Sequence, residues 1–433
     1  MAEILKDRTL LNDEHILFLE NEYIKLGVNI GLGGSVTYLS EHGKPNLINS
    51  FDWGRQIQMS FYSGPIPFEP EGQVVREEWK TLGWNPIQVG DCYNHPSTVL
   101  EYKVSDNEVY VKSIPMQWPM DNVPGECTFE TWYSLEGKKV KVRARLNNNR
   151  ADKTQYKGRH QELPAVYTNG VWYKLVSYIG NEPCTGDAIT EICNKENKRG
   201  WPWVGFKATE GWAALVDDDG YGLGVYNNDT CDWIGGFAAA DVSQMGTGGE
   251  KDFPTGYISP LCCEIIDHNI VYDYDYVLII GDVDSIRDYA VSRIKEERIK
   301  KYAFDKTRQH FSYVNITDAG YPPKGCLEFD FAPDKVVIGP TQFHDGRKID
   351  HILVDAELDQ DGILCLNLMC YDGQFHEERH FQYPFNVNGF NAKAGRHTYE
   401  LPIDCDAGVI AFMLHFGSTG HLKLYSIEFV EKE

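Results

Sequence analysis

The chain has 433 residues, which is longer than one ordinary hydrophobic core and predicts two domains. Its formal net charge of −23 argues against a nucleic-acid partner, because a phosphate backbone requires a basic surface. The sequence contains no run of about 18 apolar residues, so it predicts no membrane-spanning helix and no membrane partner.

The composition favours β structure, with 25 Tyr, 20 Phe, 10 Trp and 40 Gly. The 11 Cys are scattered without a C-x-x-C pair, and Met1–Arg8 contains no apolar signal core. We therefore expect reduced thiols in a cytoplasmic protein, with secretion as the alternative if a leader precedes these residues.

Residues 15–49 predict two opening strands. Ile24, Leu26, Val28 and Ile30 alternate before a glycine-rich turn at 31–34; a second strand follows at 35–39, and then Asn46-Leu47-Ile48. This order resembles the opening of galactose-mutarotase-like domains and extends over about residues 15–280. The resemblance implies a large antiparallel β-super-sandwich, an architecture shared by aldose epimerases, polysaccharide lyases and glycoside hydrolases.

Residues 56–62 predict a strand whose polar face carries Gln56, Gln58, Ser60 and Tyr62. Amides and hydroxyls in register suit a groove that binds sugar hydroxyls, although a solvated face is the alternative. Long aromatic loops follow, and loops of this length are usually functional. The side chains expected to bind substrate are Gln56, Gln58, Trp84, Trp118, Trp203 and His95.

The segment 158–167 concentrates ionisable groups before it turns apolar. In a strand, His160 and Glu162 share one face, while Arg159 and Gln161 share the other. Pro164 disfavours a helix interior and a central ladder position, so the cluster is expected at a strand end. A salt-bridge cluster at a sheet edge is the alternative interpretation.

The remaining elements complete an all-β chain. Asp217–Gly220 predicts the turn of a hairpin, and residues 282–303 predict the one convincing helix, which would close a first domain of residues 1–305. After about residue 315, Trp disappears and short alternating segments return. Residues 320–433 are expected to form a smaller β-sandwich similar to galactose-binding-like jelly-roll modules, with a carbohydrate-binding, structural or dimerising role.

One metal motif is present but lacks its usual context. His376-Glu377-Glu378-Arg379-His380 matches H-E-x-x-H, which binds zinc when both histidines lie on one helix face. Gly373 and Pro384 bracket the segment and aromatic residues alternate within it. We therefore predict a strand, no metal site and no cofactor.

Three sugar chemistries fit the candidate residues. A hydrolase needs two carboxylates, here Glu162 with Glu126 or Asp121. An epimerase needs a His acid and a carboxylate base, and a lyase needs a base such as Tyr or His with an Arg that neutralises a uronate. The predicted catalytic set is His160, Glu162, Arg159, Arg55, Tyr62 and Glu126.

The aromatic loops favour an extended glycan, and hence a glycoside hydrolase acting on an oligo- or polysaccharide. A lyase, an aldose 1-epimerase and a non-catalytic glycan-binding protein remain the alternatives. The expected partners are a carbohydrate and, in one alternative, further copies of the chain.

Overall fold

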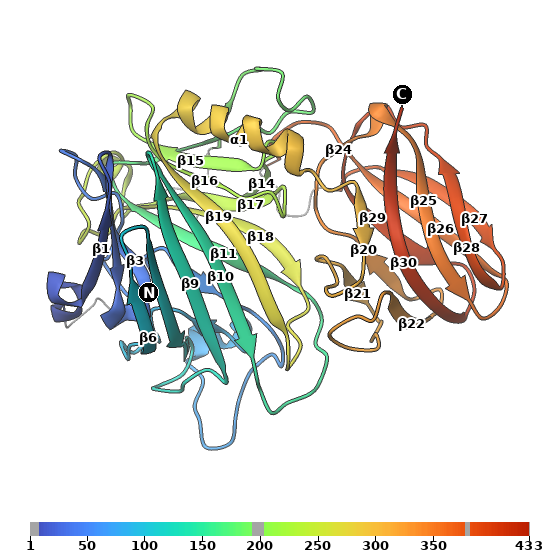
Figure 1. The fold of residues 1–433 in the computed structure, drawn as a ribbon, viewed down its shortest axis with the longest axis horizontal. Coiled ribbons are helices and arrows are strands. Elements are labelled where there is room, and N and C mark those ends of the chain that lie inside the picture. Colours follow the sequence, from blue (N-terminus) through green and yellow to red (C-terminus); the bar gives the residue numbers. More distant parts are fainter. Residues whose placement is uncertain (1–7, 193–202, 377–381, 433) are drawn as a thin grey trace.

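The computed structural model describes residues 8–192, 203–376 and 382–432. These residues form an all-β protein, as the sequence predicted, in which antiparallel sheets pack in pairs (Figure 1). A small sheet near the N-terminus contains β1 (Ile16–Glu20), β2 (Ile24–Asn29) and β3 (Ser35–Glu41). The predicted strands at 24–30 and 35–39 are therefore confirmed as β2 and β3.

The first large sheet has nine strands among the described residues. It crosses the front of Figure 1. In sheet order its strands are β13 (Thr190–Glu191), β12 (Lys174–Ser177), β15 (Trp212–Val216), β16 (Tyr221–Tyr226), β19 (Val271–Asp282), β10 (Lys139–Asn148), β9 (Cys127–Glu136), β7 (Glu108–Ile114) and β6 (Thr98–Val104). The hairpin predicted around Asp217–Gly220 is confirmed as β15 and β16.

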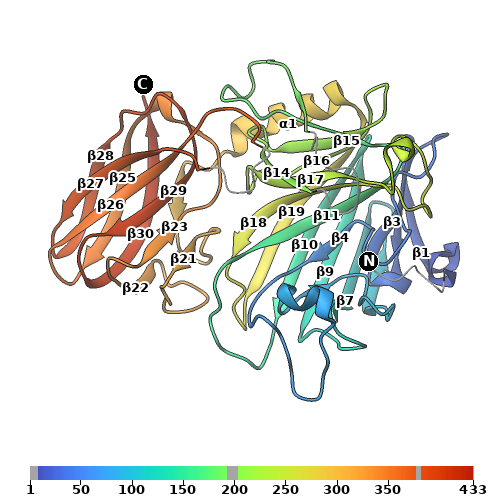
Figure 2. The same ribbon diagram turned by 180° about the vertical axis from the view of Figure 1, so that it is seen from behind.

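The second large sheet has seven strands in the described part of the chain and faces the viewer in Figure 2. Its inner face packs on the nine-stranded sheet, and one apolar core fills the space between them. In sheet order its strands are β14 (Val204–Lys207), β17 (Asp232–Ala238), β18 (Thr255–Glu264), β11 (Arg159–Asn169), β4 (Gln58–Ser60), β5 (Pro86–Ile87) and β8 (Met116–Gln117).

Helix α1 (Val283–Glu297) covers the outer face of the nine-stranded sheet. Asp282 caps it by accepting a hydrogen bond from the Ser285 amide at 2.8 Å. Three of its residues, Ile286, Ala290 and Ile294, are buried against the sheet. Six short 3-10 helices occur among the described residues: Thr9–Leu11, Asp13–His15, Ile30–Leu32, Glu77–Leu82, Val242–Gln244 and Gly346–Lys348.

The predicted helix 282–303 is too long. It ends at Glu297, and residues 301–303 form a strand because Tyr302, with no exposed surface, belongs to the second core and pairs with Ile427. The second unit thus begins at β20, earlier than the expected boundary at 320. Its first sheet contains β20 (Lys301–Ala303), β30 (Gly420–Glu431), β25 (Ile349–Leu358), β28 (Gly395–Pro402) and β22 (Leu327–Phe331).

The partner sheet of the second unit packs against the first across its own apolar core. It contains β21 (Ser312–Val314), β23 (Val336–Ile338), β29 (Gly408–Phe416), β26 (Gly362–Tyr371), β27 (Phe385–Ala392) and β24 (His344–Asp345). The two units also touch each other. Cys231 of the first unit joins an apolar cluster with Phe343, Tyr371 and Ile410 of the second, and Tyr371 Oη donates a hydrogen bond to the Ile179 carbonyl at 2.7 Å.

None of the helices in the described residues is long and apolar enough to cross a membrane.

Candidate functional site

The outer face of the seven-stranded sheet gathers the ionisable and aromatic side chains of the candidate site. On β11, Leu163 and Val166 point into the core between the large sheets, whereas His160 and Glu162 lie on the opposite face. The pairing of Glu162 with Ser60 of β4 brings the two polar segments of the sequence together. Gln161 stabilises this pairing. Its side-chain amide accepts a hydrogen bond from the Tyr62 amide at 2.7 Å and donates one to the Tyr62 carbonyl at 3.0 Å.

Glu162 occupies an unusual position for a carboxyl group. Its side chain is partly exposed, yet it is surrounded by aromatic residues of the sheet. Burial raises its pKa above the ordinary value, and the hydroxyls of Tyr257 and Tyr62 offset only part of that effect. A raised pKa favours the protonated acid, which can donate its proton to a substrate oxygen.

An aromatic wall stands beside Glu162. The ring of Tyr257 lies 4.7 Å from that of Tyr167 and 4.8 Å from that of Trp203, measured between centroids. Tyr257 is 1% exposed, and its hydroxyl lies close enough to Glu162 to lower the pKa of that carboxyl. Trp203 is partly exposed, so its indole can contact a bound molecule as well as the wall.

A second carboxylate, Asp232, lies on the same face near the second unit. Lys207 Nζ donates a hydrogen bond to Asp232 Oδ1 at 2.8 Å, and His160 Nε2 lies 3.7 Å from Asp232 Oδ2. Glu162 pairs with Leu261 of β18, and Trp233 of β17 pairs with the adjacent Pro260. Glu162 and Asp232 therefore flank Leu261 from opposite sides, with Cα atoms about 9.5 Å apart at the usual strand spacing.

The second unit contributes Tyr383 to this end of the face. Burial raises the pKa of Tyr383 to about 12, and Lys207 opposes the shift as a nearby cation. The Tyr383 ring also packs on Tyr371, at 5.6 Å between centroids. The candidate site thus extends from the aromatic wall to a boundary between the two units.

The two predicted arginines lie near the face but are held by the protein. Arg159 donates to the Leu82 carbonyl, and its guanidinium lies 5.5 Å from the centre of the Tyr62 ring. Arg55 is 7% exposed, pairs with Asp52 at 3.2 Å and donates to the Phe253 carbonyl.

No protein-family model matches the sequence, and no curated protein is significantly similar to it. Solved structures similar to the chain include a galactose mutarotase-related enzyme from Lactobacillus acidophilus, with TM-score 0.39 and 10% identity over 61% of this chain and 97% of its own. A galactose mutarotase-like protein from Lactobacillus casei has a TM-score of 0.41 and 11% identity, and the match covers 61% of this chain and 99% of its own. The 4-alpha-glucanotransferase from Thermococcus litoralis has a TM-score of 0.34 and 14% identity, and the match covers 62% of this chain and 37% of its own.

Four of the predicted substrate-binding side chains are buried and serve the protein itself. Trp84 has no exposed surface and Trp118 is 5% exposed, so neither indole offers a stacking platform. Gln56 donates its amide to the Asp52 carbonyl at 2.8 Å. Gln58 donates to the Gly54 carbonyl at 3.0 Å and accepts from the Val89 amide. Their polar face is covered rather than open, because the loops after β4 fold over it.

Two further predicted residues lie apart from Glu162. Glu126 precedes β9 of the other large sheet and accepts a hydrogen bond from the Ala151 amide at 3.2 Å. His95 lies in a loop, with its Nδ1 2.9 Å from Asp91 Oδ2. No interaction among the described residues joins either of them to Glu162. Sequence reasoning missed Asp232, Lys207 and Tyr257 because only strand pairing brings them to this face.

The H-E-x-x-H segment lies largely outside the described residues, which include only His376 of its five positions. His376 is in a loop after β26, not in the predicted strand. The cause is the turn at Asp372, whose carboxylate accepts a hydrogen bond from the Gln374 amide and lies 2.7 Å from His376 Nε2.

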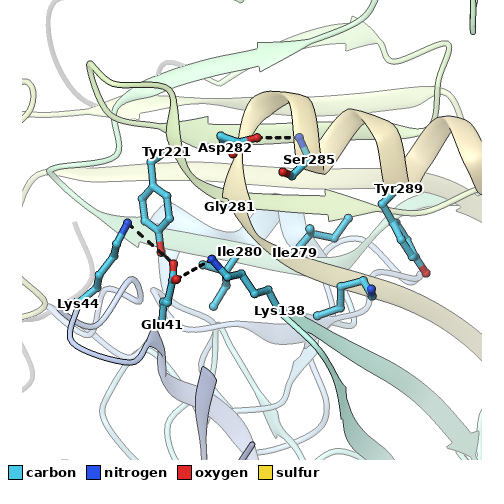
Figure 3. A pocket seen from close by; sticks show the side chains of 11 residues that line it. Glu41, Lys44, Lys138, Tyr221, Ile279, Ile280, Gly281, Asp282, Ser285 and Tyr289 are labelled. Atoms are coloured by element: carbon cyan, nitrogen blue, oxygen red, sulfur yellow. Dashed lines mark hydrogen bonds and ion pairs between the residues drawn. The ribbon is translucent and has the colours of Figure 1, made fainter. Parts of the chain in front are cut away.

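A second depression, of about 350 Å³, lies between α1 and the small N-terminal sheet (Figure 3). Glu41 is central to it. Its carboxylate accepts hydrogen bonds from Lys138 at 2.6 Å and from Tyr221 at 2.8 Å. The Nζ of Lys44 lies 3.9 Å from the same carboxylate. Since these charged groups satisfy one another, the depression is a weaker candidate than the sheet face.

Proposed function

We propose that the protein is a carbohydrate-active enzyme, and specifically a glycoside hydrolase acting on an oligo- or polysaccharide. Glu162 acts as the general acid that protonates the glycosidic oxygen. Asp232 acts as the general base that activates water, and the wall of Trp203, Tyr257 and Tyr167 contacts a sugar ring. The proposed chemistry uses two carboxyl groups and water.

The observation that carries this proposal is the placement of two carboxyl groups in different environments on one face. Glu162 lies among aromatic rings, which favour its protonated form, whereas Asp232 forms an ion pair with Lys207. Two carboxyls with different environments supply an acid and a base. The intervening strand β18 keeps the two side chains apart, and an inverting enzyme needs about 6.5–9.5 Å between its carboxyl groups to leave room for water.

The alternatives fit the local chemistry less well. A lyase could use Tyr62 or His160 as its base, and Tyr62 is disfavoured because burial and the nearby Glu162 raise its pKa well above the ordinary value. An epimerase would need Glu162 as a base, whereas its raised pKa favours the protonated acid. A protein that only binds glycans would not need an acid and an ion-paired carboxylate on one face.

The test is incubation of the purified chain with a panel of glycans, reading new reducing ends together with the absorbance of unsaturated uronates. We expect reducing ends without unsaturated products. Glu162→Gln and Asp232→Asn should each lower turnover about 100- to 10,000-fold, the usual contribution of acid–base catalysis.

Glu126→Gln is the matched control, since this carboxylate precedes β9 of the other large sheet and accepts from the Ala151 amide, and the variant should keep normal turnover. Near-normal activity of both Glu162→Gln and Asp232→Asn on a confirmed substrate would disprove the assignment. Unsaturated uronates as the product would replace hydrolysis by elimination.

A further inference from the structure

A cluster of metal-binding side chain types lies away from the proposed catalytic face. Asp229, Cys262 and His310 present one ligand atom each, and the three atoms lie within 4.8 Å of one another. They come from distant parts of the sequence. Asp229 lies between β16 and β17, Cys262 lies on β18, and His310 lies in the connection between β20 and β21.

Cys262 faces the inside of the molecule, opposite to its neighbour Cys263. It is 3% exposed, and it pairs with Gln161, whose side chain has no exposed surface. Glu264 follows on the same inner face and is 4% exposed. Its Oε2 lies 3.3 Å from His310 Nδ1, which makes no hydrogen bond of good geometry with any described residue.

Tyr272 gives an independent indication that this space is built for a ligand. It is 6% exposed, and its ring centroid lies 6.1 Å from that of His310. Its hydroxyl has no hydrogen-bond partner within the described part of the chain, although buried tyrosine hydroxyls usually find one.

The backbone holds His310 in place from both sides. Gln309 and His310 have φ values of 48° and 63°, a left-handed conformation that non-glycine residues adopt only when the surroundings require it. The preceding Arg308 is fixed by Asp267 at 2.5 Å and by Asp318 at 2.6 Å. The imidazole is therefore delivered to the cluster by a rigid connection.

We propose that Asp229, Cys262, Glu264 and His310 form a closed structural site for Zn²⁺. Thiolate, imidazole and carboxylate are the ligands that zinc takes in tetrahedral sites. Zinc–ligand bonds of about 2.0–2.3 Å place tetrahedral ligand atoms about 3.3–3.8 Å apart. The His310–Glu264 distance already has that value, and the ligand atoms of Asp229, Cys262 and His310, which lie within 4.8 Å of one another, must approach by up to about 1 Å. On binding, the Cys262 thiol releases its proton to solvent.

Four protein ligands, of which Cys262 and Glu264 are buried, favour a structural role over catalysis. All four side chains are used as ligands, so no position stays open for water or substrate. The cation would join β18 and the Asp229 loop of the first unit to the connection that leads into the second. A catalytic Cys-His-Asp arrangement is less compatible with the structure, because Cys262 faces the interior and a substrate cannot reach its sulfur.

The test uses the full chain, produced without a histidine tag or chelator, and measures zinc per chain by elemental mass spectrometry. We expect about one zinc per chain, and loss of that zinc in Cys262→Ser and in His310→Asn. Cys263→Ser is the matched control, because it changes the adjacent thiol on the opposite face and should keep the metal. His376→Ala, in the H-E-x-x-H segment, should also keep it.

A second measurement keeps the proposal testable if the variants do not fold. The wild-type chain is stripped with a chelator and titrated with Co²⁺ alone, and a thiolate-to-cobalt charge-transfer band is expected at one equivalent. Failure to take up metal, a Co²⁺ complex without that band, or loss of zinc in His376→Ala with retention in Cys262→Ser would each overturn the proposal.

Discussion

Arg287 and Glu210 join helix α1 to the sheet beneath it, and we predict that Arg287→Ala strongly destabilises the protein. Glu210 has no exposed surface. Its carboxylate accepts hydrogen bonds from Arg287 Nε and Nη2, both at 2.9 Å. It also accepts from the Cys184 amide at 2.8 Å and from Trp212 Nε1 at 3.0 Å. Without the guanidinium, the buried Glu210 carboxylate would keep only two neutral hydrogen-bond donors, the Cys184 amide and the Trp212 indole.

The expected loss is about 3 kcal/mol of unfolding free energy. Removing one partner of a buried ion pair costs about 3–5 kcal/mol. The lower end applies here, because the Arg287 side chain is 14% exposed and the two remaining donors still stabilise the carboxylate. A loss of that size is a large part of the roughly 5–15 kcal/mol that stabilises a typical folded protein. The double variant Glu210→Gln, Arg287→Met should lose less, because the charge is removed together with its partner.

Urea denaturation followed by tryptophan fluorescence measures these differences. Arg293→Ala provides the control on the same helix, since Arg293 is 48% exposed and pairs with Glu297 one turn away. That variant should lose no more than about 0.5 kcal/mol. The reasoning is refuted if Arg287→Ala is as stable as Arg293→Ala, or if the double variant is less stable than the single one.

Three further predictions concern the sheet face and its surroundings. Burial raises the pKa of Glu162, so its contribution to stability is present below the unfolded pKa and is lost as pH rises through the folded pKa. The melting temperature of Glu162→Gln should therefore rise relative to that of wild type as pH increases above the unfolded pKa of about 4. A calorimetric difference that stays constant with pH would contradict this. Trp84→Ala should lower the free energy of unfolding by about 3–5 kcal/mol, because the indole fills the core. A variant that keeps its stability but no longer binds glycan would instead indicate that Trp84 stacks on a sugar. Lys207→Met should lower turnover on a confirmed glycan, because it removes the ammonium group that donates to Asp232, and unchanged turnover would argue against Asp232 as the base.

Local periodicity made much of the fold predictable from the sequence. Ile24, Leu26 and Val28 alternate with small or polar residues, and β2 has that face buried. The Asp-Gly turn specified the hairpin of β15 and β16 in the same way. The shared face of His160 and Glu162 also followed from the two-residue period of a strand, without knowledge of the partner strands.

The features that could not be predicted from the sequence depend on contacts between residues that lie far apart in the chain. Asp232 lies 70 positions from Glu162 in the numbering and reaches the same face only because β18 pairs with both β11 and β17. The burial of Trp84 in the core between the two large sheets depends on how those sheets pack, which no local pattern specifies. The sequence predicts a helix as far as residue 303, whereas the pairing of Tyr302 with Ile427 places residues 301–303 in a strand.

The contact between the two units has a consequence for protein engineering. Cys231 packs with Phe343, Tyr371 and Ile410, the Cys231 amide donates to the Thr341 carbonyl at 2.8 Å, and Tyr383 stands beside Lys207. A chain that ended after α1 would therefore lack Tyr383 at the candidate site and would expose the apolar surface around Cys231. The C-terminal sandwich therefore cannot be replaced by an unrelated domain without loss of these contacts. A chimaera made from either unit would have to keep the residues on both sides of the contact.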